Sequence, residues 1–351
     1  MPGSSFGTLF RMTTFGESHG RGVGVIVDGA TPGVEVDEAM VQRDLDRRKP
    51  GQSSVTTPRA EPDVVHIMSG VFEGVATGTP IQMILYNKDA NPGAYLEIKD
   101  KFRPGHADFT YLRKYGLRDW RGSGRSSGRE TAGRVAAGAI AKAMLARRDV
   151  SVVAYTLRAA GVGAETVDLS VIEKNPMRAP DLAAAEKMVA LVEAAKEEGN
   201  SYGGVIECRI RGVEPGIGEP VFDKLDADLA KGVLSIGATK GIEFGQGFGA
   251  AEMRGSEHND EMRSGGFVTN NAGGILGGIS TGEEIVFRVA IKPPSSIGSS
   301  QATVDVDGRE VDIRTEGRHD PCICPRVVPV VEAMAAIVIE DHYKRQRALH
   351  A

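Results

Sequence analysis

The 351-residue chain is 41% hydrophobic and 25% charged, which is typical of a folded globular protein and excludes a mainly disordered one. It contains no run of about 18 apolar residues and no basic-then-apolar leader, so we expect a soluble, cytoplasmic protein without a membrane span. Three cysteines do not suit a disulfide-linked secreted module, and we expect reduced thiols. Cys322 and Cys324 lack a second Cys or His pair, so no metal site is predicted.

Short strands and helices follow one another along the whole chain. Alternating or β-branched residues predict strands at 22–27, 152–155, 204–210 and 285–291, and Asp307-Gly308 predicts a hairpin turn between 304–306 and 311–313. Helices are expected from a cap at Asp37 to Arg48, over 130–147, over 182–198, and over 327–347 despite Pro329 near its start. The regular alternation of a doubly wound sheet is absent, so we predict an α+β fold that forms one domain over 1–351.

Charge is distributed unevenly. The segment 101–134 contains nine Lys or Arg residues and three acids, which gives it a net charge of +6. Because the whole chain has a net charge of −5, the rest of the chain has a net charge of −11. A basic segment inside an acidic protein indicates a local anionic ligand rather than general attraction to nucleic acid.

Two histidines stand in turn-like segments. His19 lies within Gly16-Glu17-Ser18-His19-Gly20, where flanking glycines let a substrate approach a group that exchanges protons near neutral pH. His106 follows Pro104-Gly105, which can present it beside Arg103. That cation would lower the pKa of His106, and a bound phosphate would raise it. The alternatives are a polar loop histidine and a purely structural pair of Arg103 with Asp108.

The segment 121–131, which reads Arg-Gly-Ser-Gly-Arg-Ser-Ser-Gly-Arg-Glu-Thr, leads into a predicted helix. Backbone N–H groups at a helix start, serine hydroxyls and guanidinium groups together suit a phosphate or a carboxylate. The segment lacks the Gly-Lys-Ser/Thr ending of a P-loop and the glycine fingerprint of a dinucleotide fold. The alternative is a solvated loop rich in Arg and Ser. Three further segments could contact a ligand. The glycine-rich segment 270–278 offers backbone without bulky side chains, 292–296 offers a cation with two hydroxyls, and 318–321 offers a cation beside a carboxylate.

These segments, in this order, closely resemble the chorismate synthase family from about Gly7 to Arg347. The matching stretches are Gly16-Glu17-Ser18-His19-Gly20, Arg103-Pro104-Gly105-His106-Ala107-Asp108, Gly124-Arg125-Ser126-Ser127, Ala272-Gly273-Gly274-Ile275-Leu276-Gly277-Gly278 and Gly317-Arg318-His319-Asp320-Pro321. The resemblance implies a single-domain subunit with helices between two antiparallel sheets, assembled as a homotetramer. It also implies a lyase that eliminates phosphate from 5-enolpyruvylshikimate-3-phosphate to give chorismate, at the end of the shikimate pathway to aromatic amino acids. Reduced FMN (FMNH2) is needed although there is no net redox change.

The resemblance also assigns residues. It implies His19 as the proton donor to the departing phosphate, His106 as the group that stabilises the anionic reduced flavin, and Asp320 in removal of the C6 hydrogen, with Asp341 as a weaker candidate. The implied substrate-binding residues are Ser18, Arg48, Arg103, Ser127, Arg129 and Arg318. The implied cofactor-binding residues are Arg125, Ser126, Ser127, Gly237, Ala238, Gly277, Lys292, Pro293, Pro294, Ser295, Ser296 and Arg318.

Three positions depart from the family pattern. Gly237 stands where many relatives have Asn, and Pro294 stands where others often have Thr, which removes a hydroxyl and an N–H donor. Ser54 replaces an arginine that would contact an anion of the substrate or of a reducing nucleotide, and Lys49 or Arg59 are the possible replacements. No extra reductase domain is visible, so we expect a separate flavin reductase to supply reduced FMN, with NADPH as an indirect reductant.

Two rival functions remain open. A polyanion-binding protein would use the basic segment alone and would show strong salt dependence, but aromatic residues for stacking make up only 5% of the chain. Another flavin-dependent oxidoreductase would oxidise a nicotinamide in proportion to turnover, whereas phosphate release without that oxidation would favour the lyase.

Overall fold

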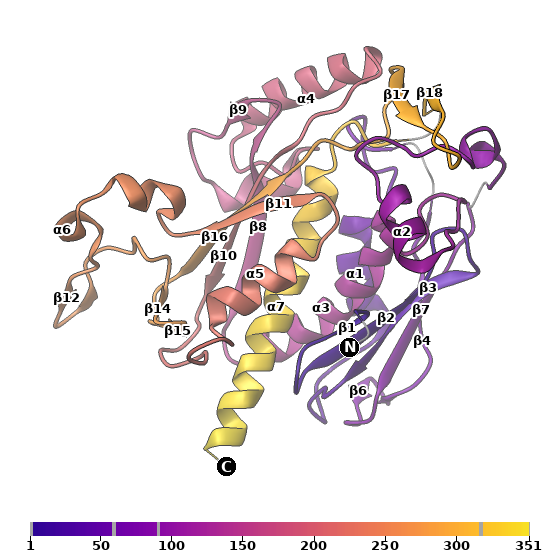
Figure 1. Ribbon diagram of the computed structural model, residues 1–351. Coiled ribbons are helices and arrows are strands. Elements are labelled where there is room, and N and C mark those ends of the chain that lie inside the picture. The colour runs from indigo at the N-terminus through magenta and orange to yellow at the C-terminus, as the bar shows by residue number, and fades with distance from the viewer. Residues whose placement is uncertain (1–2, 58–60, 90–91, 316–318, 351) are drawn as a thin grey trace.

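The structure is a computed structural model that describes residues 3–57, 61–89, 92–315 and 319–350 (Figure 1). Two five-stranded antiparallel sheets form the outer layers, and helices lie between them. The first sheet has the strand order β1 (Ser5–Phe6), β2 (Arg11–Gly16), β3 (Gly22–Asp28), β7 (Ile81–Tyr86) and β4 (Val65–Ile67). Val25 and Val27 of β3 pair with Met83 and Ile81 of β7, and all four side chains are fully buried. This inward row forms one wall of the core.

The second sheet has the order β11 (Thr239–Phe244), β16 (Ile285–Ile291), β10 (Gly204–Arg211), β8 (Ser151–Ala159) and β9 (Val162–Gly163). Cys208 pairs with Phe287, and Ile210 pairs with Ile285, all fully buried. Because side chains alternate between the faces of a strand, these residues form the opposite wall of the core.

Four helices fill the space between the sheets: α1 (Glu38–Arg48), α3 (Thr131–Ala146), α5 (Leu225–Leu234) and α7 (Cys324–Leu349). Helix α3 packs on α7 and β3, and α7 also packs on β8 and β10. A Cβ added at Gly138 of α3 would come within 2.3 Å of the Cβ of Ala333 in α7. Glycine inside a helix costs about 1 kcal/mol relative to alanine, and here it permits the close approach of two central helices.

The remaining elements lie outside this core. They comprise the helices α2 (Asp108–Tyr115), α4 (Leu182–Glu197) and α6 (Gly255–His258), and the 3-10 turns η1 (Pro92–Ile98), η2 (Gly124–Ser126), η3 (Gly128–Glu130), η4 (Leu169–Lys174) and η5 (Gly247–Glu252). The two-stranded ribbons are β5 (Val71–Phe72) with β6 (Val75–Ala76), β12 (Met262–Arg263) with β13 (Gly266–Phe267), β14 (Ile275–Leu276) with β15 (Ile279–Ser280), and β17 (Gln301–Val304) with β18 (Glu310–Ile313). Residues 245–283, which we call the arm, project away from the sheets (Figure 1).

The α+β prediction is confirmed, and the predicted elements lie close to their expected positions. Asp37 caps α1 by accepting from the N–H of Met40 at 2.6 Å, as its sequence position indicated. Helix α7 begins three residues earlier than expected, at Cys324, because Pro325 in the first turn is compatible with a helix start. Among the described residues, no helix combines the length and apolar character needed to cross a bilayer.

Candidate active site

His19 lies in the turn between β2 and β3. The buried Ser18 places its Oγ 3.0 Å from His19 Nδ1, and the imidazole packs edge-on against Tyr95 with 5.2 Å between ring centroids. A Cβ at Gly122 would lie 2.3 Å from His19 Nδ1, and Gly122 has a φ of +71°. Only glycine suits both the space and the backbone conformation, so the basic segment can pass directly over the histidine.

His106 lies in the turn before α2, among charged groups. Arg103 donates to Asp108 through Nε and Nη2, both at 2.8 Å. His106 Nδ1 is 3.3 Å from both Arg103 Nη2 and Asp108 Oδ1, and its Nε2 is 2.8 Å from Ser123 Oγ. Burial lowers the pKa of His106, the hydrogen bond to Asp108 opposes this, and the Arg103 charge lowers it further. Both interpretations from sequence therefore apply: Arg103 pairs with Asp108 and also lies beside His106.

The two histidine turns share neighbours. Arg103 Nη2 donates to the carbonyl oxygen of Gly122 at 2.6 Å, and the Arg103 guanidinium lies 5.8 Å from the ring centroid of Tyr95. Gly122 and Tyr95 are also the residues that contact His19. The tertiary structure thus brings both predicted histidines to one site.

The Ser- and Gly-rich segment forms two 3-10 turns that lead into α3. Ser127 Oγ accepts from the N–H of Arg129 at 3.2 Å, which places Arg129 at the helix start as expected. Arg125 donates to Thr14 Oγ1 at 2.7 Å and to backbone oxygens of β2, so it joins this segment to the first sheet. Ser126 Oγ donates to the carbonyl of Ser123 at 2.8 Å. The segment is therefore an ordered wall of the site.

Arg48 and Arg129 meet at a buried carboxylate. Arg48 is 1% exposed and Arg129 is 5% exposed, and between them lies Asp63, which is 0% exposed. Arg48 Nη2 pairs with Asp63 Oδ2, and Arg129 Nη1 pairs with Asp63 Oδ1. Arg129 Nε donates to Asn87 Oδ1 at 2.9 Å, and the Asn87 amide donates to the carbonyl of Gly20 at 2.9 Å. This arginine pair is thereby connected to the loop that carries His19.

This cluster retains positive charge. Burial alone would raise the pKa of Asp63, but Arg48 and Arg129 outweigh it and hold that pKa below its usual range. Burial lowers the pKa of Arg48 to about 10 against the opposing charge of Asp63, so Arg48 stays protonated at neutral pH. Two guanidinium groups thus share one carboxylate. Among the described residues, Arg48 Nε and Arg129 Nη2 are buried without a hydrogen-bond partner, which suits the arrival of an anion.

Asp63 was missed in the sequence analysis. It stands in Glu61-Pro62-Asp63-Val64, a segment without distinctive spacing, and its partners Arg48 and Arg129 lie 15 and 66 residues away. Its φ of +51° is a feature of the folded backbone that no sequence pattern indicated.

Asp320 lies next to the arginine cluster. Its Oδ1 accepts from the N–H of Thr57 at 2.9 Å, and its Oδ2 pairs with Arg326 Nη1 at 2.5 Å. Arg326 Nε in turn donates to the carbonyl of Arg48 at 3.2 Å. Arg318, which the resemblance places in the same segment, lies outside the described residues.

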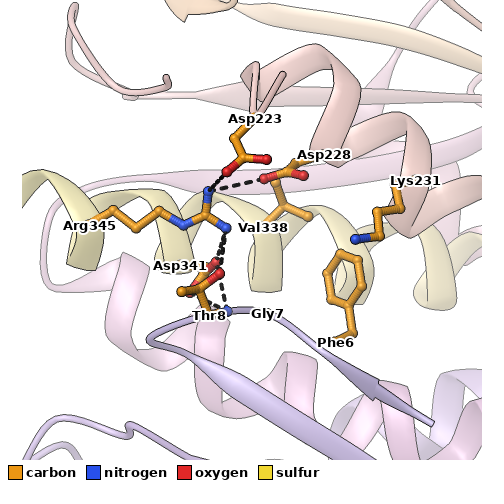
Figure 2. A pocket seen from close by; sticks show the side chains of 9 residues that line it. All are labelled: Phe6, Gly7, Thr8, Asp223, Asp228, Lys231, Val338, Asp341 and Arg345. Carbon is orange, nitrogen blue, oxygen red and sulfur yellow. Dashed lines mark hydrogen bonds and ion pairs between the residues drawn. The ribbon is translucent and has the colours of Figure 1, made fainter. Parts of the chain in front are cut away.

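Asp341 lies elsewhere, in a small pocket between α7, α5 and the N-terminal loop (Figure 2). Its carboxylate accepts from the backbone N–H groups of Thr8, Leu9 and Phe10 at 2.6–3.1 Å and from Arg345 at 2.7 Å. At ~1.5 Å per residue it lies about 26 Å along α7 from the helix start that follows Asp320. The geometry therefore favours Asp320 over Asp341 as the acid of this site.

Several of the residues assigned to the cofactor lie beside the His106 turn. Lys292 donates from Nζ to the carbonyl of Gly105 at 3.1 Å and from its backbone N–H to the carbonyl of Ala238 at 2.9 Å. A Cβ at Gly105 would lie 3.1 Å from Ser295 Cβ, so the 292–296 segment, including Pro293 and Ser296, runs close to this turn. Gly237 precedes Ala238, which has a φ of +72°.

Gly277 and Ser54 both lie in surroundings that the sequence did not predict. Gly277 lies in the turn between β14 and β15 on the arm, on the far side of the second sheet from α2 (Figure 1). Ser54 stands where many family members have an arginine. Its backbone carbonyl accepts a hydrogen bond from Nζ of Lys196 in α4 at 3.2 Å, and this cation was not predicted from the sequence. Lys49 instead pairs with Asp46 at 2.9 Å, and Arg59 lies outside the described residues.

The fold is α+β, and among the described residues the site brings together two histidines and a buried arginine pair, an arrangement typical of enzymes that act on anionic substrates. A model of the chorismate synthase family matches residues 10–343. Chorismate synthase of Roseiflexus castenholzii is 56% identical, covering 99% of this chain and 98% of the relative. That of Methanosarcina acetivorans is 54% identical, covering 98% and 97%. A crystal structure of chorismate synthase matches with a TM-score of 0.76 and 29% identity, covering 97% of this chain and 93% of the other.

The chain belongs to the chorismate synthase family. It is accordingly an enzyme of the carbon–oxygen lyase class, and membership of this family implies a requirement for a reduced flavin.

Proposed function

We propose that this chain eliminates phosphate from 5-enolpyruvylshikimate-3-phosphate to form chorismate, and that it uses reduced FMN to do so. The observation that carries the proposal is the buried pair Arg48 and Arg129, which keeps unpartnered N–H groups among the described residues and excess positive charge beside the loop of His19. A substrate with one phosphate and two carboxylates requires several charge-assisted hydrogen bonds, and arginine supplies these in bidentate form.

The substrate contacts in this proposal come from Ser18, Arg48, Arg103, Ser127 and Arg129, with Arg318 assigned by the family resemblance alone. Arg103 is held by Asp108 through two hydrogen bonds, so its orientation is fixed before any ligand binds. Arg48 and Arg129 are fixed in the same way by Asp63. Preorganised cations of this kind reduce the conformational cost of binding a small polyanion.

The proton-handling groups are His19, His106 and Asp320. Ser18 and Gly122 hold His19 so that its ring can donate a proton to the departing phosphate. Burial keeps the pKa of His106 low in the free enzyme, and a nearby anion raises it, so His106 can become the cation that stabilises a bound anionic flavin. Asp320 acts in the removal of the C6 hydrogen, held in place by Arg326 and the N–H of Thr57.

FMN fits the residues around Gly105. When bound, the reduced flavin supplies electron density to the reacting substrate without net redox change. Lys292 offers an ammonium group there, and Ser295 and Ser296 offer hydroxyls, while Arg125, Ser126 and Ser127 form the neighbouring wall. Ala238 and Gly237 offer backbone only, which is compatible with the loss of a side-chain contact at position 237.

The assembly in this proposal is a homotetramer, and the position of Gly277 supports contact between copies of the chain. In a single chain it lies away from the other cofactor residues, on an arm that exposes Phe248 (83%), Met262 and Val268. Exposed apolar side chains gathered on a projecting segment are typical of a protein interface. A second copy that covers the arm would bury these residues and place its own Gly277 at a neighbouring site.

The cellular setting completes the proposal. The chain works as one domain in the cytoplasm, and a separate flavin reductase supplies reduced FMN, with NADPH as the indirect reductant.

The 101–134 segment supports a small-molecule ligand over a long polyanion, because several of its cations are paired locally. Arg118 lies 3.0 Å from Asp108, and Arg121 lies 2.8 Å from Asp119.

An anaerobic assay tests the reaction. The purified chain, chemically reduced FMN and 5-enolpyruvylshikimate-3-phosphate are mixed without any nicotinamide, and chorismate and inorganic phosphate are measured together. Equal amounts of both products, with the flavin still reduced at the end, are expected. A parallel reaction contains added NADPH. Product that forms only there, with one nicotinamide oxidised per product, would instead identify another flavin oxidoreductase, and the absence of product in both reactions would refute the proposal.

A further inference from the structure

The backbone at Asp63 is anchored to the helix that carries Arg48. Gln42 of α1 donates from Nε2 to the carbonyl of Asp63 at 3.1 Å, and its Oε1 accepts from the N–H of Val65 at 3.1 Å. Asp63 adopts a left-handed φ of +51°, a conformation that Asp tolerates better than most residues. The position of this carboxylate relative to α1 is therefore set by the backbone as well as by its ion pairs.

The two oxygens of Asp63 are divided between the two arginines. Each oxygen pairs with a different guanidinium, Oδ2 with Arg48 and Oδ1 with Arg129. Two buried cations repel each other strongly in a low-dielectric interior, so the carboxylate both neutralises part of their charge and fixes their separation. Each guanidinium is restrained by a further hydrogen bond. Arg129 Nε donates to Asn87 Oδ1 at 2.9 Å, and Arg48 Nη1 donates to the carbonyl oxygen of Gly128 at 3.3 Å.

Each buried donor that lacks a partner costs about 1–3 kcal/mol, and a bound anion can remove that cost. This network leaves one N–H direction on each arginine, Arg48 Nε and Arg129 Nη2, without a partner among the described residues. Two such donors on adjacent arginines that share one carboxylate suit a further anion.

We propose that Asp63 is a positioning residue for the substrate: it holds Arg48 and Arg129 so that their remaining N–H groups converge on one phosphate or carboxylate group. This inference rests on the proposed function, in which both arginines bind substrate. Asp63 itself does not touch the substrate, and it acts through the two arginines.

Asp63→Asn is the direct test. The pKa of Asp63 lies below its usual range, so the change removes a real negative charge at neutral pH. Asparagine keeps the shape of the side chain, but its NH2 group faces one of the two guanidinium groups. Both groups are hydrogen-bond donors, so that guanidinium loses its partner and is no longer held in place. We expect the KM for 5-enolpyruvylshikimate-3-phosphate to rise by roughly 10- to 150-fold, the range for one lost hydrogen bond to a charged group, with kcat largely unchanged because the missing hydrogen bond would hold ground state and transition state alike.

Glu340→Gln is the matched control. Glu340 is also fully buried and paired with an arginine, Arg148 at 2.9 Å, but it lies far along α7 from the site. It should leave KM unchanged, because Glu340 pairs with Arg148 and with neither arginine of the site. If Asp63→Asn changes only stability, or if its KM falls because Asp63 competes with the substrate for the arginines, the inference is overturned.

Gln42→Ala provides a second test that does not depend on the folding of Asp63→Asn. It removes the hydrogen bonds of Gln42 with the Asp63 carbonyl, the Val65 N–H and the exposed Asp46, of which the first two anchor this backbone, and it leaves both ion pairs chemically intact. We expect KM to rise by at least roughly 2- to 13-fold, the range for one neutral hydrogen bond, and an unchanged KM would overturn the inference. If the unmodified chain neither binds nor converts the substrate, the proposed function fails instead, so the two failures are distinguishable.

Discussion

Arg129→Lys is the substitution whose outcome follows most directly from the geometry. Arg129 is almost fully buried and directs three nitrogens in one plane: Nη1 to Asp63, Nε to Asn87, and Nη2 toward no described partner. Lysine has one nitrogen on a flexible stem. It can keep the ion pair with Asp63, but it cannot also bond to Asn87 and reach an anion.

The size of the effect follows from the hydrogen bond that lysine cannot make. A substrate anion held by Arg129 Nη2 would lose one charge-assisted hydrogen bond, worth about 1.5–3 kcal/mol, which corresponds to roughly 10- to 150-fold weaker binding. Binding of free FMN should change much less, because the flavin is assigned to the residues around Lys292 and Gly105, whereas Arg129 bonds to Asp63 and Asn87.

Isothermal titration of each ligand separately measures both effects. Arg148→Lys is the control, since Arg148 follows the far end of α3 and pairs with Glu340 at 2.9 Å. It should leave both affinities unchanged. An unchanged substrate affinity in Arg129→Lys would mean that Arg129 only stabilises the helix start, and the assignment of the arginine pair to the substrate would be refuted.

Two further predictions concern turnover and acid stability. His19→Ala and His106→Ala should fold normally yet lower turnover by on the order of 10² to 10⁴, whereas the control His66→Ala on β4 should not; near-normal rates in both site variants would refute the acid–base roles. Burial would raise the pKa of Glu332, but Lys142 and Arg47 lower it to about 2, so its stabilisation is complete above the ordinary pKa and is lost as the pH falls through about 4.5 toward 2. At ~1.4 kcal/mol per pKa unit, the lowering from 4.5 to about 2 corresponds to about 3.5 kcal/mol of stability. Urea unfolding from about pH 6 to pH 3 should show a shallower loss in Glu332→Gln, and identical slopes would contradict the shift.

The sequence alone determined part of the secondary structure and the chemistry-bearing turns, whereas strands β2 and β7 and helix α5 were not predicted. Asp37 begins α1, Gly199 follows α4, and the turn at Asp307-Gly308 separates β17 from β18. These features could be predicted because capping, turn formation and side-chain periodicity act over a few residues. The glycine-flanked His19 and the turn before His106 were recognisable for the same reason.

Only the tertiary structure decided how these segments combine. Gly122 is placed over His19, Asp63 is placed between Arg48 and Arg129, and Gly277 is carried away on the arm. Asp341 and Asp320 are both acids near α7 in sequence, yet one binds the N-terminal loop and the other adjoins the arginine cluster. Each of these outcomes depends on contacts between segments that are distant in the chain, and the packing of two sheets around α3 and α7 sets those contacts. They could not be predicted from the sequence, because no local pattern encodes which remote backbone a side chain will meet.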